Sequence, residues 1–560
     1  MSRSLSSVPS ETGPVPRQAL GAGSPNYHWW ITSVLMLGFT AAGLSVTVVN
    51  LAFPNIMTSL RADLDVIQWV QTGYMIMQAV MMPSVGWLGA RLGNRQLYLL
   101  ALGTFVGGSI LCGMAWDVYS LIAFRLVQAI GAGPLFPITQ AIMFQTFPEE
   151  KRGLAMGISS LGFSFGPMIG PVLGGYLLEH ASWRAVFYIN VPVGLIGLGM
   201  AYLILPRPRR QEPRSLDVMG MLSMAAFLVS FLMAMSQGRT EGWDSQYILS
   251  LLAIASVSGL TFVVTELRSR QPFVELRLYT NVAFAMASIV VFLNTMGFMA
   301  ANFIVTLFLQ IHLDYTPLQA AWMLMPSAVV IGVLSVICGR LSDFVSAKAL
   351  VIFGLAAVAF CLFQYVHITP WTSAGVITFW LTARGFARAF TIAPLSAASL
   401  KALPESAIRM GTGLLSLNRG IASSCSVALT ATVFQNRLTQ RSILIAQDQS
   451  VAQVGQEDLL QHLNLVFEGL GDFSQIASTK ALAMLSQLVN LEAALYSYHD
   501  TFIIIGCISA AGILPALWIG GRPAAPVHPP TIQPSVLTSD ADDNAHEPDR
   551  PASSHRISER

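Results

Sequence analysis

Long apolar runs separated by short polar segments make up most of the chain. Most of these runs have about 20 residues, the length at which an α-helix crosses the hydrocarbon core of a bilayer. The runs are continuously apolar instead of alternating with period two, so they do not predict a membrane β-barrel. Fourteen membrane-spanning helices are predicted, over residues 29–53, 67–89, 97–115, 120–144, 153–178, 185–205, 216–236, 247–266, 282–311, 317–339, 348–367, 372–398, 411–434 and 501–520.

The composition agrees with an all-α polytopic membrane protein. Hydrophobic residues make up 54% of the 560 residues and charged residues only 11%, whereas soluble proteins have about 25% charged residues. A net charge of +2 argues against nucleic-acid binding, which needs a basic face. The sequence holds no HExxH or P-loop motif, and its GxSxG match, Gly162–Gly166, lies inside a predicted helix instead of at the strand-to-helix turn of a hydrolase. Neither an enzyme nor an ATP-driven pump is therefore predicted. The five cysteines are far apart, and they predict no disulfide, metal site or cofactor.

Lysine and arginine gather in every second loop, which fixes the predicted orientation because cytoplasmic loops are enriched in these residues. With the N-terminus inside, the outside segments hold only Arg61, Arg184, Arg239, Arg437, Arg441 and Lys480. The inside segments hold Arg91, Arg95, Lys151, Arg152, Arg207, Arg209, Arg210, Arg214, Arg268, Arg270, Arg277, Arg340, Lys348, Lys401 and Arg409. We therefore expect a multi-pass protein of the cytoplasmic (inner) membrane, with both termini cytoplasmic.

An internal repeat divides the chain into two halves. Gly86-Trp-Leu-Gly-Ala-Arg-Leu-Gly-Asn-Arg95 follows the second predicted helix, and Gly339-Arg-Leu-Ser-Asp-Phe-Val-Ser-Ala-Lys348 follows the tenth. At a constant offset Gly86 matches Gly339 and Arg95 matches Lys348. Two parallel repeats around a midplane cavity are typical of alternating-access transporters.

The repeat and the polar segments predict five regions. Two six-helix bundles, 29–205 and 282–520, flank two inserted helices and their linkers in 206–281. Residues 1–28 are rich in Ser, Pro and Gly, and residues 521–560 hold many Pro, Asp, Ser and His; both ends are predicted to be disordered and cytoplasmic. The hydrophilic segment 435–499 is expected to be partly helical and extracytoplasmic, either as a surface loop or as a docking element for a partner.

Four motifs in order give the sequence a resemblance to a known family. They are Leu44–Pro54 in the first helix, Gly86–Arg95, Arg125–Pro134 in the fourth helix and Gly162–Gly175 in the fifth. Together they resemble the 14-helix drug/proton antiporter family of the major facilitator superfamily, of the EmrB/QacA type. Residues 132–137 and the long segment before the last helix are most similar to the EmrB branch.

The resemblance implies the major facilitator fold and export of small amphipathic compounds across the lipid bilayer. It also implies a proton-motive force as the energy source, and a periplasmic adaptor with an outer-membrane channel as partners. A non-transporting membrane sensor or scaffold, and an exporter of one endogenous metabolite or lipid-like compound, remain alternatives.

Candidate gating residues lie in two of the motifs. The glycines of the fifth helix recur every four residues and permit close approach of a neighbouring helix, while its prolines remove amide donors and bend it. We expect this helix to act as a hinge and seal between the halves, although tight packing alone would also explain the pattern. In the loop motif the resemblance implies a latch between the halves, with a topogenic anchor as the alternative. The gating candidates are Gly86, Arg91, Gly93, Arg95, Gly166, Pro167, Gly170, Pro171, Gly174 and Asp343.

Polar residues on apolar helices are the candidates for substrate binding and coupling. Arg125 lies inside the fourth predicted helix and should face acceptors in the bundle interior, since a buried guanidinium is costly in a membrane. Arg384, Arg388 and Arg419 are comparable residues of the second half. Hydrogen bonding between helices is the alternative role for each residue. The candidates are Thr47, Asn50, Tyr74, Gln78, Arg125, Gln128, Asn294, Asn302 and Arg419.

A carboxylate is missing where the resemblance leads one to expect it. Members of the family usually carry Asp where this chain has Ser45, and no Asp or Glu lies well inside a predicted helix. Glu179, Asp217, Glu266 and Asp500 are near helix ends. Without a buried anion, neutral or anionic amphipathic substrates are favoured over cations, with Arg125 and Arg419 as counter-charges.

Overall fold

The computed structural model describes residues 26–206, 217–269, 271–451, 462, 465–466 and 474–519. Within the helices the side chains of several residues, including Asn50, Pro167 and Pro171, are outside this description. The segments predicted to be disordered lie outside it too, except that residues 26–28 lead into the first helix.

The described residues are almost entirely helical and contain no strand. Local signals set several helix starts: Asp117 with Ser120 and Thr316 with Gln319 form capping boxes that satisfy free amides. The α-helices are α1 (Tyr27–Leu60), α2 (Leu64–Met81), α3 (Ser84–Leu92), α4 (Asn94–Gly113), α5 (Val118–Thr146), α6 (Arg152–His180), α7 (Ala185–Tyr188), α8 (Asn190–Ile204), α9 (Val218–Glu241), α10 (Gln246–Arg268), α11 (Val282–Leu307), α12 (Pro317–Leu341), α13 (Ala347–Gln364), α14 (Ala374–Lys401), α15 (Ile408–Val451), α17 (Ser474–Ala511) and α18 (Ile513–Ala516).

Each of the fourteen predicted runs coincides with helix. Three runs are divided: 67–89 becomes α2 and α3, which meet at Met82 and Pro83, 185–205 becomes α7 and α8, and 501–520 becomes the end of α17 and α18. The first break fits the proline, which lacks an amide hydrogen and clashes with a preceding turn. Ten helices of the described residues have the length and apolar composition needed to cross a membrane.

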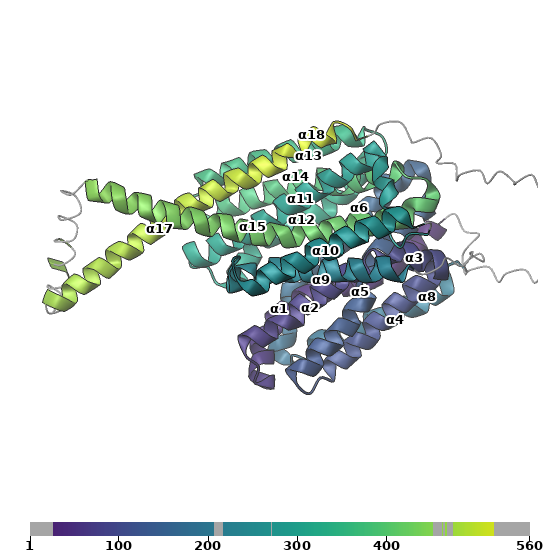
Figure 1. Cartoon of the computed structure of the whole chain (residues 1–560), viewed down its shortest axis with the longest axis horizontal. Helices are drawn as coiled ribbons and strands as arrows, with labels where there is room; N and C mark the ends of the chain where they lie inside the picture. The colour runs from purple at the N-terminus through teal and green to yellow at the C-terminus, as the bar shows by residue number, and fades with distance from the viewer. Residues whose placement is uncertain are drawn as a thin grey trace, which may run out of the picture. The chain divides into compact units, whose positions relative to one another are not determined.

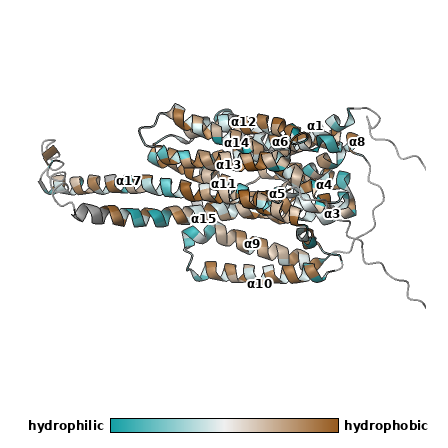
Figure 2. Ribbon diagram, turned by 90° about the horizontal axis from the view of Figure 1, so that it is seen from above, coloured by the Kyte–Doolittle hydropathy of each residue, from teal (hydrophilic) through white to brown (hydrophobic). Residues whose placement is uncertain are grey.

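The described residues form one compact unit. In its first half α1 packs on α6 and α5 packs on α2 and α4; in its second half α14 packs on α12 and α13, and α11 packs on α15. The helices α6 and α12 pack extensively against each other and join the halves. The inserted helices α9 and α10 pair with each other, and α9 lies against α2 and α15 (Figure 2).

The segment predicted to stand outside the membrane is helical wherever it is described. The helix α15 continues to Val451, and α17 begins at Ser474, so both extend past the other helices (Figure 1). Arg441 of α15 and Asp500 of α17 form an ion pair with nitrogen–oxygen distances of 2.9–3.1 Å, which fixes the two helices to each other near the point where they leave the bundle.

Candidate functional site

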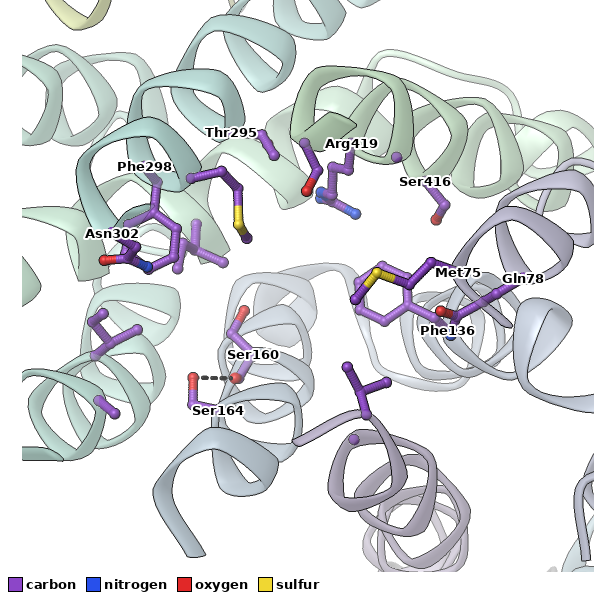
Figure 3. A pocket seen from close by; sticks show the side chains of 18 of the residues that line it. Met75, Gln78, Phe136, Ser160, Ser164, Thr295, Phe298, Asn302, Ser416 and Arg419 are labelled. Carbon is purple, nitrogen blue, oxygen red and sulfur yellow. Dashed lines mark hydrogen bonds between the residues drawn. The ribbon is translucent and has the colours of Figure 1, made fainter. Parts of the chain in front are cut away.

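A cavity of about 930 Å³ lies between the two halves. The first half contributes residues of α1, α2, α5 and α6, and the second half contributes residues of α11, α12, α14 and α15; Leu232 and Ser236 of α9 complete the lining. Figure 3 shows Met75, Gln78 and Phe136 on one side and Phe298, Asn302 and Arg419 across the space from them. Both halves therefore shape one shared chamber.

The lining is mostly apolar; both halves contribute uncharged polar residues, and its charged residues come from the second half. Arg384, Arg388 and Arg419 line it, and no Asp or Glu is among the lining residues that the structure describes. The cavity consequently carries positive charge without an acidic counterpart in its wall.

Each arginine is held by neutral partners. Arg384 donates to the side-chain oxygen of Asn302 at 2.6 Å, and Arg388 donates to that of Asn294 at 2.7 Å. Arg419 donates to the Ser396 hydroxyl at 2.8 Å. Because these acceptors are uncharged, they position the guanidinium groups but leave their charge uncompensated.

The structure separates the predicted binding residues into two groups. Gln78, Asn294, Asn302 and Arg419 line the cavity. The prediction that Thr47 faces it is not met: Thr47 lies in the α1–α6 contact, where its Cβ would be 2.9 Å from a Cβ built on Gly170. The side chain of Asn50 is outside the described residues. Tyr74, Arg125 and Gln128 form a separate site, described next.

Arg125 is fully buried inside the first half, away from the cavity lining. Its Nη1 donates to Ser45 Oγ at 3.0 Å and to Gln128 Oε1 at 2.7 Å, and its Nη2 donates to Gln71 Oε1 at 3.0 Å. Its guanidinium carbon lies 3.9 Å from the centre of the Tyr74 ring. The expectation that Arg125 supplies a counter-charge in the cavity is therefore wrong, because its donors already serve α1, α2 and its own helix.

One end of the bundle is closed by contacts between the halves. This closed end is where α3, the N-terminus of α6 and the C-terminus of α12 meet. A Cβ on Gly157 of α6 would lie 2.5 Å from the Ser335 carbonyl oxygen of α12, and one on Gly339 would lie 2.9 Å from Gly157 Cα. The Ser335 hydroxyl donates to the Gly157 carbonyl oxygen at 3.1 Å. These helices touch through their backbones, which glycine alone permits.

Charged groups add further contacts at the closed end. The Asp343 carboxylate accepts hydrogen bonds from the Gly153 and Leu154 amides at 2.7 and 3.1 Å, so an acid of the second half caps α6 of the first. Arg409 donates to the Gly89 carbonyl oxygen at 3.1 Å, and Arg152 pairs with Glu405 at 3.0 Å. At the other end the lining reaches Leu318, the second residue of α12.

The predicted gating residues of the loop motif and its repeat divide into two groups. Gly86 and Asp343 contact the other half, as a latch requires, whereas Arg91 and Arg95 stack within their own half. Arg91 stacks on Trp87 and Arg95 on Tyr202, both within the first half. Gly86 faces Met410 of the second half, and Gly93, with φ of 81°, forms the turn into α4. The latch is thus made by Asp343 and Arg409, since Ala90 offers no carboxylate in the first copy of the motif.

The glycine pattern of α6 also needs a correction. Gly166, Gly170 and Gly174 pack on Gly43, Thr47 and Val48 of α1, inside the same half. They therefore do not seal the two halves; Gly153 and Gly157, earlier on α6, do. The side chains of Pro167 and Pro171 are outside the described residues. The contact of Gly153 and Gly157 with the other half could have been located from the sequence, because Ser335 and Gly339 of α12 form a second pair of small residues at the same spacing.

Comparison with known proteins gives consistent matches. The family model described as Major Facilitator Superfamily matches residues 35–426, more than half of the chain. The chain is 29% identical to an uncharacterized MFS-type transporter, YhcA, of Bacillus subtilis (strain 168), over 87% of this chain and 92% of that protein. It is 28% identical to the multidrug export protein EmrB of Escherichia coli (strain K12), over 84% of this chain and 91% of that one.

A solved structure supports the fold independently. The human organic anion transporter MFSD10 (TETRAN) superposes with a TM-score of 0.58 at 15% identity, covering 86% of this chain and 99% of that chain. At this identity the likeness concerns the arrangement of helices alone.

Proposed function

The chain belongs to the Major Facilitator Superfamily, a family of membrane transporters, and we propose that it exports small neutral or anionic amphipathic compounds by alternating access. One observation carries the proposal: a large, mainly apolar cavity between the halves that is closed at one end. A chamber of this size and composition suits a drug-sized ligand.

The contacts at the closed end indicate how the cavity changes from one side of the membrane to the other. The half 29–205 rocks against the half 282–520, so that Gly157 and Gly339 separate while the opposite ends approach. The Asp343 cap and the Arg409 contact are hydrogen bonds between side chains of one half and backbone groups of the other, which can break and re-form without unfolding a helix. They stabilise the state seen here.

Export requires the closed end to face the cytoplasm, in the inner membrane, with both termini inside. The described cations support this orientation, because Arg91, Lys151, Arg340, Lys348 and Lys401 all belong to the end that holds α3 and the start of α6. In this orientation the cavity of the present state is directed toward the outside.

We further propose that proton entry drives export, since the sequence holds no nucleotide-binding motif. The proton carrier has to lie outside the described cavity lining, which holds no carboxylate. Two buried carboxylates are available. Asp343 caps α6, and Glu266, at the end of α10, is only 1% exposed although the sequence placed it merely near a helix end.

Cellular accumulation tests export and its energy source together. Cells expressing the protein are expected to accumulate less of a neutral or anionic fluorescent amphiphile than cells with empty vector, and a proton uncoupler should remove the difference. The panel includes a quaternary ammonium dye of similar size, for which little or no difference is expected. Equal accumulation in both cell types for every compound would favour the sensor or scaffold alternative, and efflux that survives the uncoupler would reject proton coupling.

The projecting parts of α15 and α17 are proposed to bind a periplasmic adaptor that leads to an outer-membrane channel. Their exposed apolar side chains support this, because apolar residues in water mark protein contacts. They include Ile443, Leu444, Ile476, Leu482 and Leu491, each more than 40% exposed. An ordinary surface loop is the alternative.

Capture of the adaptor by affinity-tagged protein tests this surface. Replacing 440–495 by a short Gly-Ser linker is expected to abolish capture, and Leu482→Glu with Leu491→Glu should weaken it severalfold, because charge is introduced on the apolar face. The matched control is Trp371→Glu in the loop before α14, because Trp371 is 94% exposed but lies outside both the projection and the membrane-spanning helices. Capture that survives the deletion would contradict the proposal.

A further inference from the structure

The three cavity arginines lie close to one another on the second half. Arg384 and Arg388 are four residues apart on α14 and so share one face of the helix. Arg388 lies within electrostatic range of both Arg384 and Arg419. Like charges at this spacing repel each other, so the arrangement is costly unless something compensates it.

Their hydrogen bonding is also incomplete. Arg384 is only 2% exposed, and its Nε and Nη1 have no hydrogen-bond partner among the described residues; the same is true of Arg388 Nε. A guanidinium presents five N–H donors in a planar fork. Buried donors without acceptors are unfavourable, and three of them on two arginines that line the cavity indicate a ligand that supplies acceptors.

An aromatic ring completes the arginine wall. The guanidinium carbon of Arg388 lies 3.6 Å from the centre of the Phe298 ring, and that of Arg384 lies 5.6 Å from it. Stacking holds a guanidinium plane in place and leaves its edge free to bind. Together with Asn294 and Asn302, the ring preorganises both groups from α11.

We propose that Arg384 and Arg388, assisted by Arg419, form a binding site for the single anionic group of an amphipathic organic anion. This inference rests on the proposed function and names its substrate class. A carboxylate or sulfonate offers two or more oxygens that match the guanidinium fork. The ligand also relieves the repulsion among the three cations.

The rest of the cavity defines the rest of the ligand. The rest of the lining is mainly apolar, with Met75 and Phe136 from the first half (Figure 3) and Trp322 and Met325 from α12. Thioethers adapt to varied shapes, so the apolar body can vary while the anionic group is required. A quaternary cation of the same size is excluded by repulsion from the arginines.

A matched pair of probes tests the site by direct binding. The full-length protein in lipid nanodiscs is titrated with a dansylated amino acid, which carries one carboxylate, and with its neutral methyl ester. The wild type is expected to bind the carboxylate about tenfold or more tightly than the ester. Arg388→Gln should weaken carboxylate binding about ten- to a hundredfold and leave ester binding nearly unchanged. Arg388→Lys, which keeps the charge, should retain part of the preference.

The control is Arg340→Gln, because Arg340 lies at the end of α12 outside the cavity lining and is expected to leave both affinities unchanged. Equal binding of the two probes to the wild type would overturn the inference. So would a parallel loss of both probes in Arg388→Gln and Arg388→Lys, which is the behaviour of arginines that only hold helices together.

Uptake of the same probes into inverted vesicles separates this inference from the proposed function. Transport of the ester as well as the carboxylate, with equal affinities, would retain export and reject the anion site. Tight carboxylate binding without any transport would retain the site and reject export.

Discussion

Replacing Gly157 by alanine is expected to reduce export at least about tenfold while the protein remains folded. The added methyl group would lie 2.5 Å from the Ser335 carbonyl oxygen and 2.8 Å from Val336 Cα, both backbone atoms that cannot rotate away. The halves must then separate at the closed end. A shift of about 1.4 kcal/mol between the two access states changes their ratio tenfold, and such an overlap easily supplies that amount.

Thiol labelling follows the population of the closed state directly. Ser342→Cys, introduced after removal of the five native cysteines, places a reporter whose native hydroxyl lies against Gly153. We expect slow labelling in the otherwise unchanged protein and fast labelling with Gly157→Ala. Gly199→Ala is the matched control, because a Cβ on Gly199 meets nothing within 4 Å. Unchanged labelling together with unchanged export would show that this contact does not control access.

Replacing Arg125 by methionine is expected to abolish export and to destabilise the first half by about 3 kcal/mol. The change removes hydrogen bonds to Ser45, Gln71 and Gln128, and each hydrogen bond to a charged group contributes about 1.5–3 kcal/mol. It also removes the guanidinium donors from three buried oxygens, Ser45 Oγ, Gln71 Oε1 and Gln128 Oε1, which is costly in itself.

Thermal unfolding in lipid nanodiscs and efflux assays measure the two effects. Arg125→Lys is the informative second variant, because an ammonium is a point charge that cannot reach all of these acceptors at once. It should recover part of the stability but little of the transport. Full efflux by the methionine variant would show that the cluster has no part in the conformational change.

Much of the fold could be predicted because membrane helices are recognised by the length and apolar composition of their sequences. All fourteen runs coincide with helix, and the family prediction is confirmed by the match to residues 35–426. Helix ends inside apolar sequence were harder to predict. Pro83 divides one apolar run. Conversely, α15 continues far into a polar segment, because polar residues in water can form a helix as readily as apolar residues in lipid.

The site was harder to predict than the fold, for a physical reason. Arg125 and Arg388 are both cations inside apolar helices, and polarity along one helix does not say which neighbouring helix an arginine faces. The direction in which Arg125 faces depends on its acceptors, Gln71 of α2 and Ser45 of α1. The pairs Arg384–Asn302 and Arg388–Asn294 were easier to predict. Two arginines on one helix and two asparagines on a neighbouring antiparallel helix, each at a helical spacing, are able to pair with each other.

The absence of an aspartate at position 45 also has a structural meaning. In the family that this sequence resembles, a carboxylate at this position could pair with the arginine of the fourth helix. Here a hydroxyl and two amides replace it, so Arg125 keeps its positive charge without an ionic partner in the described cluster.

The unbroken course of α15 has a mechanical consequence. The same 44-residue helix carries Arg409 at the interface of the halves, Arg419 in the cavity and Arg441 beside Asp500. At 1.5 Å per residue its tip lies about 50 Å beyond Arg419, and a rigid-body rotation of about 10° would sweep that tip through about 9 Å. Each transport cycle would therefore displace the tip of α15 by this distance. Any protein bound to the tip must either move with it or change its shape.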